Sequence, residues 1–203
     1  MFKNLSKTIE ELDTSSISER RLQILQRFTA LLSDELKSNQ VVKLNFICTH
    51  NSRRSHLVQV WAQTLANYFG LNMQCFSGGT EATAVYPMVT KTLRKQGFGI
   101  GELKRPKNPL YYLKSGENAQ PLVLFSKTYD DPFNPKNGYT AVMTCADADE
   151  NCPIVLGAKH RFALTYDDPK TFDGTAQAQA KYLERSTQMA TELFVVFQQL
   201  AKL

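Results

Sequence analysis

Cys48 and Arg54 are the residues whose types and spacing point most directly to chemistry. Five residues separate them, and Ser55 follows the arginine. The apolar run 41–47 before them is typical of a buried strand, and 55–69 is typical of a helix. A loop between such elements directs backbone N–H groups and the positive end of the helix dipole at one point, which suits a tetrahedral oxyanion. Arg54 can clamp two oxygens of that anion, and the same positive field would hold Cys48 as a reactive thiolate.

The residues between Cys48 and Ser55 supply the other positions of this expected anion site. Ser55 is expected to cap the helix with its hydroxyl and also to donate to the Cys48 sulfur. His50 is expected to contribute its backbone N–H to the site. His56 is expected to be a surface residue in the first turn of the helix, and Arg53 is expected to be a solvated surface charge. The predicted oxyanion-binding positions are Thr49, His50, Asn51, Ser52, Arg53 and Ser55.

The composition is that of an ordinary globular protein with a mild basic bias. The chain has 203 residues, of which 42% are hydrophobic and 21% charged, with a net charge of +5, which suits one domain and an appendage. The basic residues are scattered, which suits an anionic substrate and gives no argument for nucleic acid. No apolar run is long enough to span a membrane and no apolar signal core is present near the N-terminus, so we expect a cytoplasmic protein. Four cysteines in that compartment favour catalytic, redox or metal-binding roles over structural disulfides.

Hydrophobic periodicity predicts strands that alternate with helices along most of the chain. Expected helices cover 1–38, 55–69, 87–96 and 175–201, and expected strands cover 41–47, 72–76, 121–125, 139–144 and part of 157–162. Ser16 and Glu19 fit a capping box, and 102–120 is expected to be loop-like. The alternation predicts a three-layer α/β fold, in which a mostly parallel central sheet of about four strands is flanked by helices, with an extra N-terminal helix.

Cys145 and Cys152 form a second group of chemically capable residues. Cys145 follows the predicted strand 139–144, so it falls at the carboxyl end of a strand, as Cys48 does. The segment between the two cysteines is acidic, and a cysteine pair in such a segment is a redox candidate. Two unrelated thiols are one alternative, and a zinc site that adds His160 is another, although it lacks an evident fourth ligand. If the segment is helical, a disulfide between the two requires the helix to unwind.

Two Asp-Asp-Pro segments each offer a general acid, which oxyanion transfer needs in order to protonate the leaving oxygen. Asp168 precedes Pro169, and Asp131 precedes Pro132. Both aspartates therefore have the restricted backbone geometry that a following proline imposes. Their local sequences do not choose between them.

These segments together resemble the low-molecular-weight protein tyrosine phosphatase superfamily and, within it, the thioredoxin-coupled arsenate reductases. Residues 48–55 look like the phosphate loop of that superfamily, and 77–81 resemble the loop after its second strand. Residues 144–154 resemble the redox segment of the reductases, and 166–169 resemble the segment that carries the general acid. The resemblance therefore implies that Asp168 is the acid.

The same resemblance implies a domain organisation. It assigns 39–203 to a domain like those of the phosphatases and arsenate reductases, after an N-terminal helical extension at 1–38. The connection near 103–138 is longer than usual for the superfamily and reads as an insertion, which contains Asp131. Cys75 has no assigned role and is expected to be a buried core thiol.

The resemblance also implies a mechanism. The Cys48 thiolate attacks arsenate held by the loop amides and Arg54, while Asp168 protonates the departing oxygen. Cys145 then attacks Cys48, arsenite leaves, and Cys152 attacks Cys145 to free Cys48. Thioredoxin reduces the resulting disulfide, because strained disulfides are readily reduced. Thioredoxin is thus the expected external reductant, and neither a bound cofactor nor a metal is expected.

A low-molecular-weight phosphatase that hydrolyses phosphotyrosine or small phosphoesters through a Cys48 phosphoenzyme is the alternative function. Both activities use Cys48, Arg54 and Asp168. The phosphatase branch usually carries an aromatic residue after Asp-Pro, where Lys170 stands here, and it does not need the second cysteine pair. Both features favour the reductase. A third class, a non-catalytic anion-binding module, is disfavoured because all three of these residues are intact.

Overall fold

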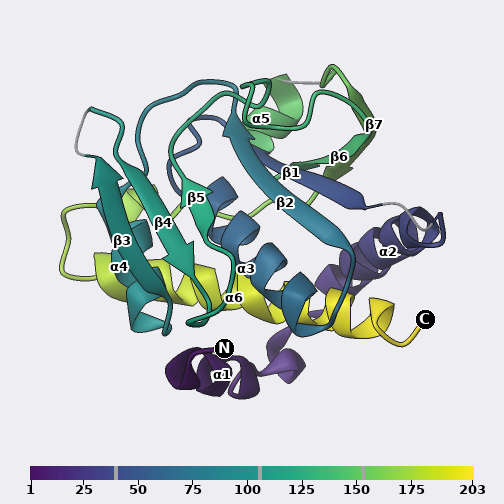
Figure 1. Ribbon diagram of the computed structural model, residues 1–203, viewed down its shortest axis with the longest axis horizontal. Coiled ribbons are helices and arrows are strands. Elements are labelled where there is room, and N and C mark those ends of the chain that lie inside the picture. The colour runs from purple at the N-terminus through teal and green to yellow at the C-terminus, as the bar shows by residue number, and fades with distance from the viewer. Residues whose placement is uncertain (39–40, 105–106, 152–153) are drawn as a thin grey trace.

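A four-stranded parallel sheet forms the centre of the computed structural model, which describes residues 1–38, 41–104, 107–151 and 154–203. The strand order is β2-β1-β6-β7, and every neighbouring pair is parallel. The strands are β1 (Val42–Cys48), β2 (Met73–Gly79), β6 (Tyr139–Met143) and β7 (Ala158–Ala163). The predicted α/β architecture, with helices flanking the sheet and an added N-terminal helix, is confirmed (Figure 1).

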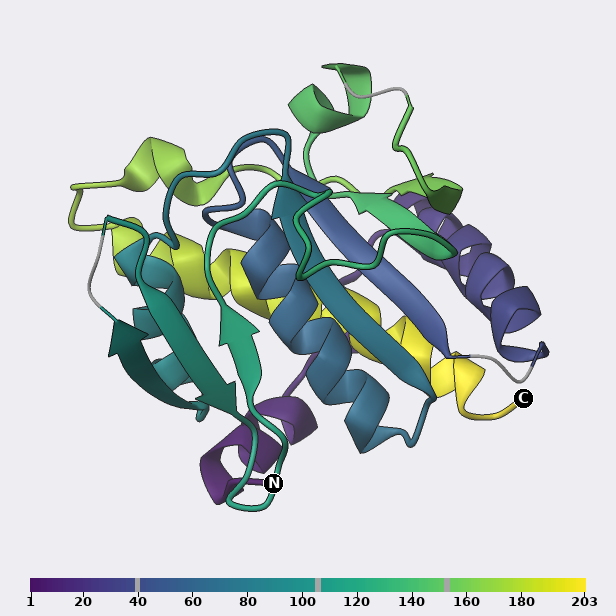
Figure 2. The same ribbon diagram turned by 45° about the horizontal axis from the view of Figure 1, so that its top comes forward.

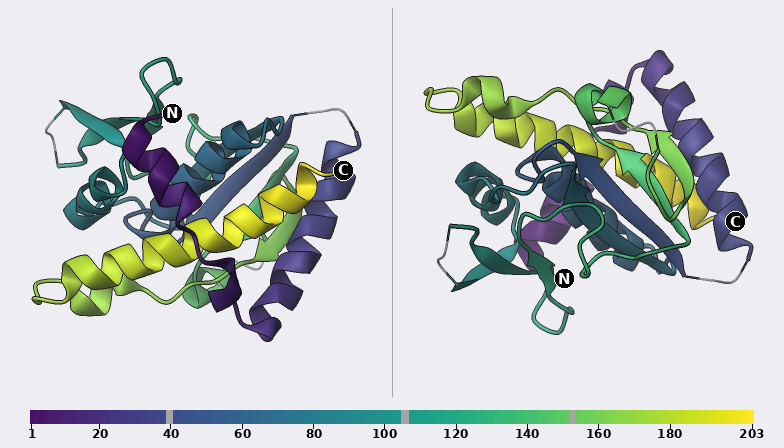
Figure 3. Two further views of the ribbon diagram at one scale, coloured as in Figure 1. Left: turned by 90° about the horizontal axis from the view of Figure 1, so that it is seen from below. Right: turned by 90° about the horizontal axis from the view of Figure 1, so that it is seen from above.

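Strand β1 is buried on both of its faces. Leu44 and Phe46 belong to the core that the sheet shares with α3 (Arg54–Tyr68) and α6 (Ala178–Leu200). Ile47 points to the other face, where short segments of chain cover the sheet in place of long helices. Double burial explains why the sequence of this strand is a nearly continuous apolar run. Seen from below, α6 crosses the sheet with α2 (Glu19–Leu36) beside it (Figure 3).

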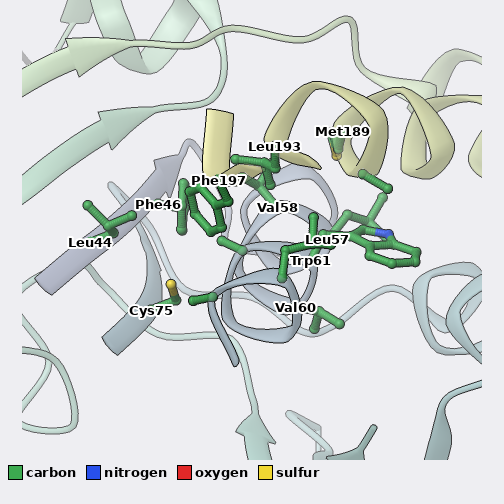
Figure 4. Close-up of a cluster of buried hydrophobic side chains, with 14 of the residues drawn as sticks. Leu44, Phe46, Leu57, Val58, Val60, Trp61, Cys75, Met189, Leu193 and Phe197 are labelled. Atoms are coloured by element: carbon green, nitrogen blue, oxygen red, sulfur yellow. The ribbon is translucent and has the colours of Figure 1, made fainter. Parts of the chain in front are cut away.

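The main core lies between the sheet and the helices α3 and α6. Trp61 of α3 is fully buried, and its indole N–H donates to the Ser186 hydroxyl of α6 at 2.9 Å. Figure 4 shows side chains of β1, β2, α3 and α6 gathered in this core. Full burial of each large apolar side chain contributes about 1.5–3 kcal/mol. Cys75 lies in this core, as predicted, and burial raises the pKa of its thiol.

A second, antiparallel sheet stands beside the main sheet and was not predicted (Figure 2). Its strands are β3 (Gly99–Lys104), β4 (Leu110–Lys114) and β5 (Leu122–Leu124), in that order. The expectation that 102–120 is loop-like is therefore wrong, whereas the strand expected at 121–125 is present as β5 and belongs to this second sheet. The prolines and glycines around β4 suggested a loop, but Tyr111 and Leu113 alternate with more exposed neighbours and are buried.

The first 38 residues fold into two helices that join the main core. They are α1 (Lys3–Glu10) and α2, with the 3-10 helix η1 (Thr14–Ser16) between them. Buried residues of both helices, including Leu5, Phe28 and Leu32, lie in the same core cluster as α3 and α6. The predicted cap is displaced, since Ser18 and not Ser16 accepts a hydrogen bond from the backbone N–H of Arg21.

Three short helical elements complete the chain. They are α4 (Pro87–Lys95), α5 (Ala146–Asn151) and the 3-10 helix η2 (Pro169–Phe172). Proline at the first position of α4 suits a helix start, because its missing N–H has no partner there in any case. Among the described residues, none of the helices combines the length and apolar character needed to cross a membrane.

Gly97 shows how tightly α1 is docked. Its φ is +99°, and a Cβ there would lie 2.4 Å from the backbone nitrogen of Leu5. We predict that Gly97→Ala lowers the free energy of unfolding by about 1–3 kcal/mol more than Gly138→Ala does, because overpacking adds to the backbone strain. Gly138 is the matched control, with φ +69° and open space around its Cβ position. Urea unfolding of both variants measures the difference, and equal losses would contradict tight docking of α1.

Candidate active site

The predicted anion loop lies where β1 ends and α3 begins. Asn51 in this loop has φ +42°, the single positive value among the described non-glycine residues. Its side chain donates to the Ser55 hydroxyl at 2.8 Å and accepts from the Lys127 N–H at 2.9 Å. Asparagine tolerates this left-handed backbone better than most residues. Asn51 therefore fixes the turn that bends the loop back over the start of α3.

Ser55 contacts the candidate nucleophile. Its Oγ lies 3.1 Å from the Cys48 sulfur, and Cys48 itself is buried. The Asn51 amide already donates to Ser55, so the serine hydroxyl retains its own hydrogen for the sulfur. The expected contact with Cys48 is thus present. The expected helix cap is wrong, because Arg53 occupies the capping position and makes no side-chain cap.

His56 is completely buried, which corrects the expectation of a surface side chain. Its Nε2 lies 2.9 Å from the Asn51 carbonyl oxygen, and its Nδ1 lies 3.3 Å from the Ser77 hydroxyl. Burial, assisted by the positive charge of Lys127, lowers the pKa of His56 to about 3. The ring is therefore neutral at ordinary pH and supports the loop from beneath.

Arg54 and Asp168 meet, although 114 positions separate them in the sequence. The Arg54 guanidinium donates to the Asp168 carboxylate at 2.6 Å and to the Tyr166 carbonyl at 3.1 Å. Asp131 lies elsewhere, where its carboxylate accepts from the Phe133 N–H at 2.8 Å. Of the two candidate acids, Asp168 is the one in direct contact with the arginine of the anion loop.

Arg53 is not the solvated surface charge that its position suggested. Its guanidinium donates to the Tyr182 hydroxyl at 2.7 Å and to the Asp173 carboxylate at 2.5 Å. It also lies 4.1 Å from the centre of the Tyr86 ring. Asp173, Tyr182 and Tyr86 were not singled out from the sequence, because nothing in their local sequences links them to Arg53. Together they tie the outer side of the loop to η2, α6 and α4.

Cys145 lies beside the anion loop. Its sulfur is 3.6 Å from the Thr49 hydroxyl, and the thiol is fully buried. Thr49 also donates to the Asp147 carboxylate at 2.5 Å, which links the loop to the first turn of α5. Cys48 and Cys145 belong to one buried cluster, which also contains Ile47 on the face of the sheet away from α3 and α6. The structure thus brings the first two predicted thiols of the relay to the same place.

Of the other residues predicted for a redox or zinc site, the structure describes His160. Cys152 lies outside the described residues. His160, which the zinc alternative requires, is on β7 with its Nε2 3.3 Å from the Glu35 carboxylate. The described residues contain no group of three or more potential metal ligands. The segment after Cys145 is helical as α5, the case in which a disulfide requires unwinding.

The segment 77–81 packs against the anion loop, although its first residues belong to β2 and not to a loop. The backbone N–H of Thr80 donates to the Cys48 carbonyl at 3.1 Å, and that of Glu81 donates to the Thr49 carbonyl at 2.8 Å. A Cβ at Gly79 would lie 2.6 Å from the Thr49 oxygen, so the close approach requires glycine. The side chain of His50 remains half-exposed, 3.7 Å from Glu81.

The amino-acid sequence of this chain is similar to those of bacterial proteins named arsenate reductase. Arsenate reductase 2 of Staphylococcus haemolyticus is 30% identical over 127 residues, which cover 61% of this chain and 76% of that protein. An arsenate reductase of Bacillus licheniformis is 25% identical over 140 residues, covering 69% and 83% respectively. No family model matches the chain.

Solved structures extend the similarity at the level of fold. A low-molecular-weight protein tyrosine phosphatase from Bacillus subtilis has a TM-score of 0.53 at 16% identity, covering 79% of this chain and 98% of that one. A low-molecular-weight phosphotyrosine phosphatase from Vibrio cholerae has a TM-score of 0.51 at 13% identity, covering 78% and 95%. An arsenate reductase in a phosphate-binding state has a TM-score of 0.50 at 16% identity, covering 78% and 98%.

The buried His56 predicts a pH dependence of stability. The unfolded chain takes up a proton at His56 near pH 6.5, whereas the folded chain does so only near pH 3. The neutral His56 therefore contributes its full share to the free energy of unfolding above pH 6.5. As the pH falls from 6.5 toward 3, the free energy of unfolding drops by up to about 1.4 kcal/mol per pH unit. Chemical unfolding between pH 6.5 and 5 should show this slope. His56→Gln should flatten it and His50→Gln should retain it, whereas an unchanged slope in His56→Gln would refute the assignment.

Proposed function

This chain belongs to the low-molecular-weight protein tyrosine phosphatase superfamily, and we propose that within it the protein reduces arsenate to arsenite. The observation that carries the proposal is the buried Cys145 thiol beside Thr49 of the anion loop. A phosphatase needs one cysteine at this site, whereas reduction of arsenic needs a second thiol to form a disulfide. The relatives named arsenate reductase support the same choice.

The first step is nucleophilic attack by the Cys48 thiolate on arsenic(V). The loop amides and the Arg54 guanidinium hold the other arsenate oxygens, and the Ser55 hydroxyl stabilises the sulfur by its contact at 3.1 Å. Binding of the anion draws N–H groups of Arg54 away from Asp168, which frees that carboxylate to take up a proton from water and pass it to the departing oxygen. The product is a Cys48–arsenic(V) adduct and water.

The second step is attack by Cys145 on the Cys48 sulfur. A Cys48–Cys145 disulfide forms, the electron pair of the sulfur–arsenic bond goes to arsenic, and arsenic(III) leaves as arsenite. Cys152 then attacks Cys145, which transfers the disulfide to Cys145–Cys152 and releases the Cys48 thiolate. Since α5 follows Cys145 directly, this transfer requires α5 to unwind. We propose that thioredoxin in the cytoplasm reduces the final disulfide and that no bound cofactor takes part.

A phosphatase is the second candidate, because the same Cys48, Arg54 and Asp168 would suffice for it. The Cys48 thiolate would attack phosphorus, Asp168 would protonate the leaving alcohol, and water would hydrolyse the phosphoenzyme. The shared fold with solved phosphatases favours keeping this candidate. Lys170, which follows Asp-Pro, weighs against an aromatic phosphoester, because its side chain offers no ring to pack on the substrate.

Steady-state NADPH oxidation with arsenate, thioredoxin and thioredoxin reductase tests the reductase, beside hydrolysis of p-nitrophenyl phosphate by the same sample. We expect arsenate-dependent oxidation that Cys145→Ser abolishes, because this variant lacks the thiol that forms the first disulfide. Cys75→Ala is the control, since Cys75 lies in the core and outside the relay, and should keep turnover. Phosphoester hydrolysis without an arsenate signal would make the protein a phosphatase.

The two Asp-Asp-Pro segments offer a matched test of the general acid. We predict that Asp168→Asn slows turnover by about 10²–10⁴-fold, because it removes the proton donor in contact with Arg54. Asp131→Asn should change turnover little, since Asp131 has its own local hydrogen bond to the Phe133 N–H. Initial rates of both purified variants provide the comparison. A larger loss for Asp131→Asn would reverse the assignment.

A further inference from the structure

Tyr166 is the point at which the N-terminal extension meets the acid segment 164–168. Its side chain is buried, and the Arg21 guanidinium of α2 lies 4.8 Å from the centre of its ring. Arg21 donates to the Glu192 carboxylate of α6 at 2.7 Å. The side chains of Arg21 and Glu192 are 16% and 3% exposed, so the pair is held in a largely desolvated position.

The backbone of Tyr166 connects its buried ring to the candidate active site by two hydrogen bonds. Its carbonyl accepts from Arg54 at 3.1 Å, and its N–H donates at 3.1 Å to the carbonyl of Thr144, which precedes Cys145. Two residues later, Asp168 accepts from the same Arg54 guanidinium at 2.6 Å. One short segment therefore sets the orientation of Arg54 at two of its nitrogens, and the ring of Tyr166 anchors that segment.

The electrostatics of the junction make Arg21 hard to replace. Burial raises the pKa of the Tyr166 phenol, and the charge of Glu192 raises it further, so the ring that Arg21 faces is neutral. Without Arg21, Glu192 would be a buried charge that has lost its ion partner. Glu192 also accepts from Gln188 of α6 at 2.9 Å, which holds its carboxylate toward this side of the helix. The guanidinium thus satisfies Glu192 and packs on Tyr166 at once.

We propose that Arg21 is a positioning residue for the oxyanion site. Through the Tyr166 ring it holds the acid segment in the place where the Tyr166 carbonyl and the Asp168 carboxylate orient Arg54. Residues 1–38 then contribute, through Arg21 of α2, to the orientation of Arg54. The proposal rests on the proposed function only for the role of Arg54 in binding the oxyanion, which the reductase and the phosphatase share.

The test measures how well inorganic phosphate protects Cys48 from iodoacetamide, read by mass spectrometry of the Cys48 peptide in the full chain. The test variant is Arg21→Met combined with Glu192→Gln, which removes the ion pair without leaving a buried charge. We expect the half-protecting phosphate concentration to rise by about 3- to 30-fold. Hydrogen exchange in 164–168 should accelerate in the same variant. Arg21→Lys is a second variant if the double variant does not fold, because it keeps a positive charge for Glu192 and removes the planar guanidinium that faces the Tyr166 ring.

Two matched controls separate positioning from general loosening of α2. Arg20→Met removes the neighbouring arginine, which is exposed. Glu35→Gln weakens the other end of the helix, where Glu35 pairs with Lys159 at 3.0 Å and with His160 at 3.3 Å, away from Tyr166. Both should leave phosphate protection within about twofold. For Arg20 this is the range of ordinary surface substitutions, and for the buried Glu35 it is expected because its ion partners lie on β7 and not at Tyr166.

The outcomes distinguish this proposal from the proposed function. Unchanged phosphate protection in the double variant, with normal protection in the unaltered chain, would overturn the role of Arg21 and leave the reductase untouched. Equal weakening by Glu35→Gln would reduce Arg21 to a general structural role and would also overturn the proposal. Failure of phosphate to protect the unaltered chain would overturn the oxyanion site and the role of Arg21 together. Absence of arsenate turnover with intact phosphate protection would count against the reductase alone.

Discussion

The left-handed turn at Asn51 is the constraint on which the rest of the site depends. A loop that gathers backbone N–H groups around an anion must bend sharply between strand and helix, and one non-glycine residue takes a costly conformation to do so. Every polar group of Asn51 named here has a partner, namely Ser55, the Lys127 backbone and His56. The buried, neutral His56 is therefore part of the support for the loop and no acid or base of the reaction.

Around that loop, the charged residues are held by partners from distant parts of the chain. Arg53 is fixed by Asp173 and Tyr182, and Arg54 is fixed by Asp168 and the Tyr166 carbonyl. Charge-assisted hydrogen bonds of this kind preorganise donors before the anion arrives, so little reorganisation is left for the reaction itself. The buried Cys145 places a second thiol beside the same loop, and in the proposed mechanism this thiol separates a reductase from a phosphatase on a common fold.

Residues 1–38 and the second sheet both contribute side chains to the main core. The extension packs its apolar residues into the main core, and Glu35 and Arg21 pin α2 at its two ends, to β7 and to α6 respectively. Strands β4 and β5 lie within the connection 103–138 that was predicted to be an insertion, and β3 ends at its start. Both parts bury apolar surface in that core, and this burial stabilises the fold.

The sequence by itself determined the features that depend on residues close together along the chain. The spacing of Cys48 and Arg54 between a strand and a helix, the parallel α/β pattern and the buried Cys75 all follow from local periodicity and composition. Only the tertiary structure brought Asp168, and not Asp131, to Arg54 and buried His56. It also paired Arg53 with Asp173 and placed β4 in a second sheet. These outcomes depend on contacts across as many as 129 positions, and hydrogen bonds and burial at that range leave no trace in local sequence.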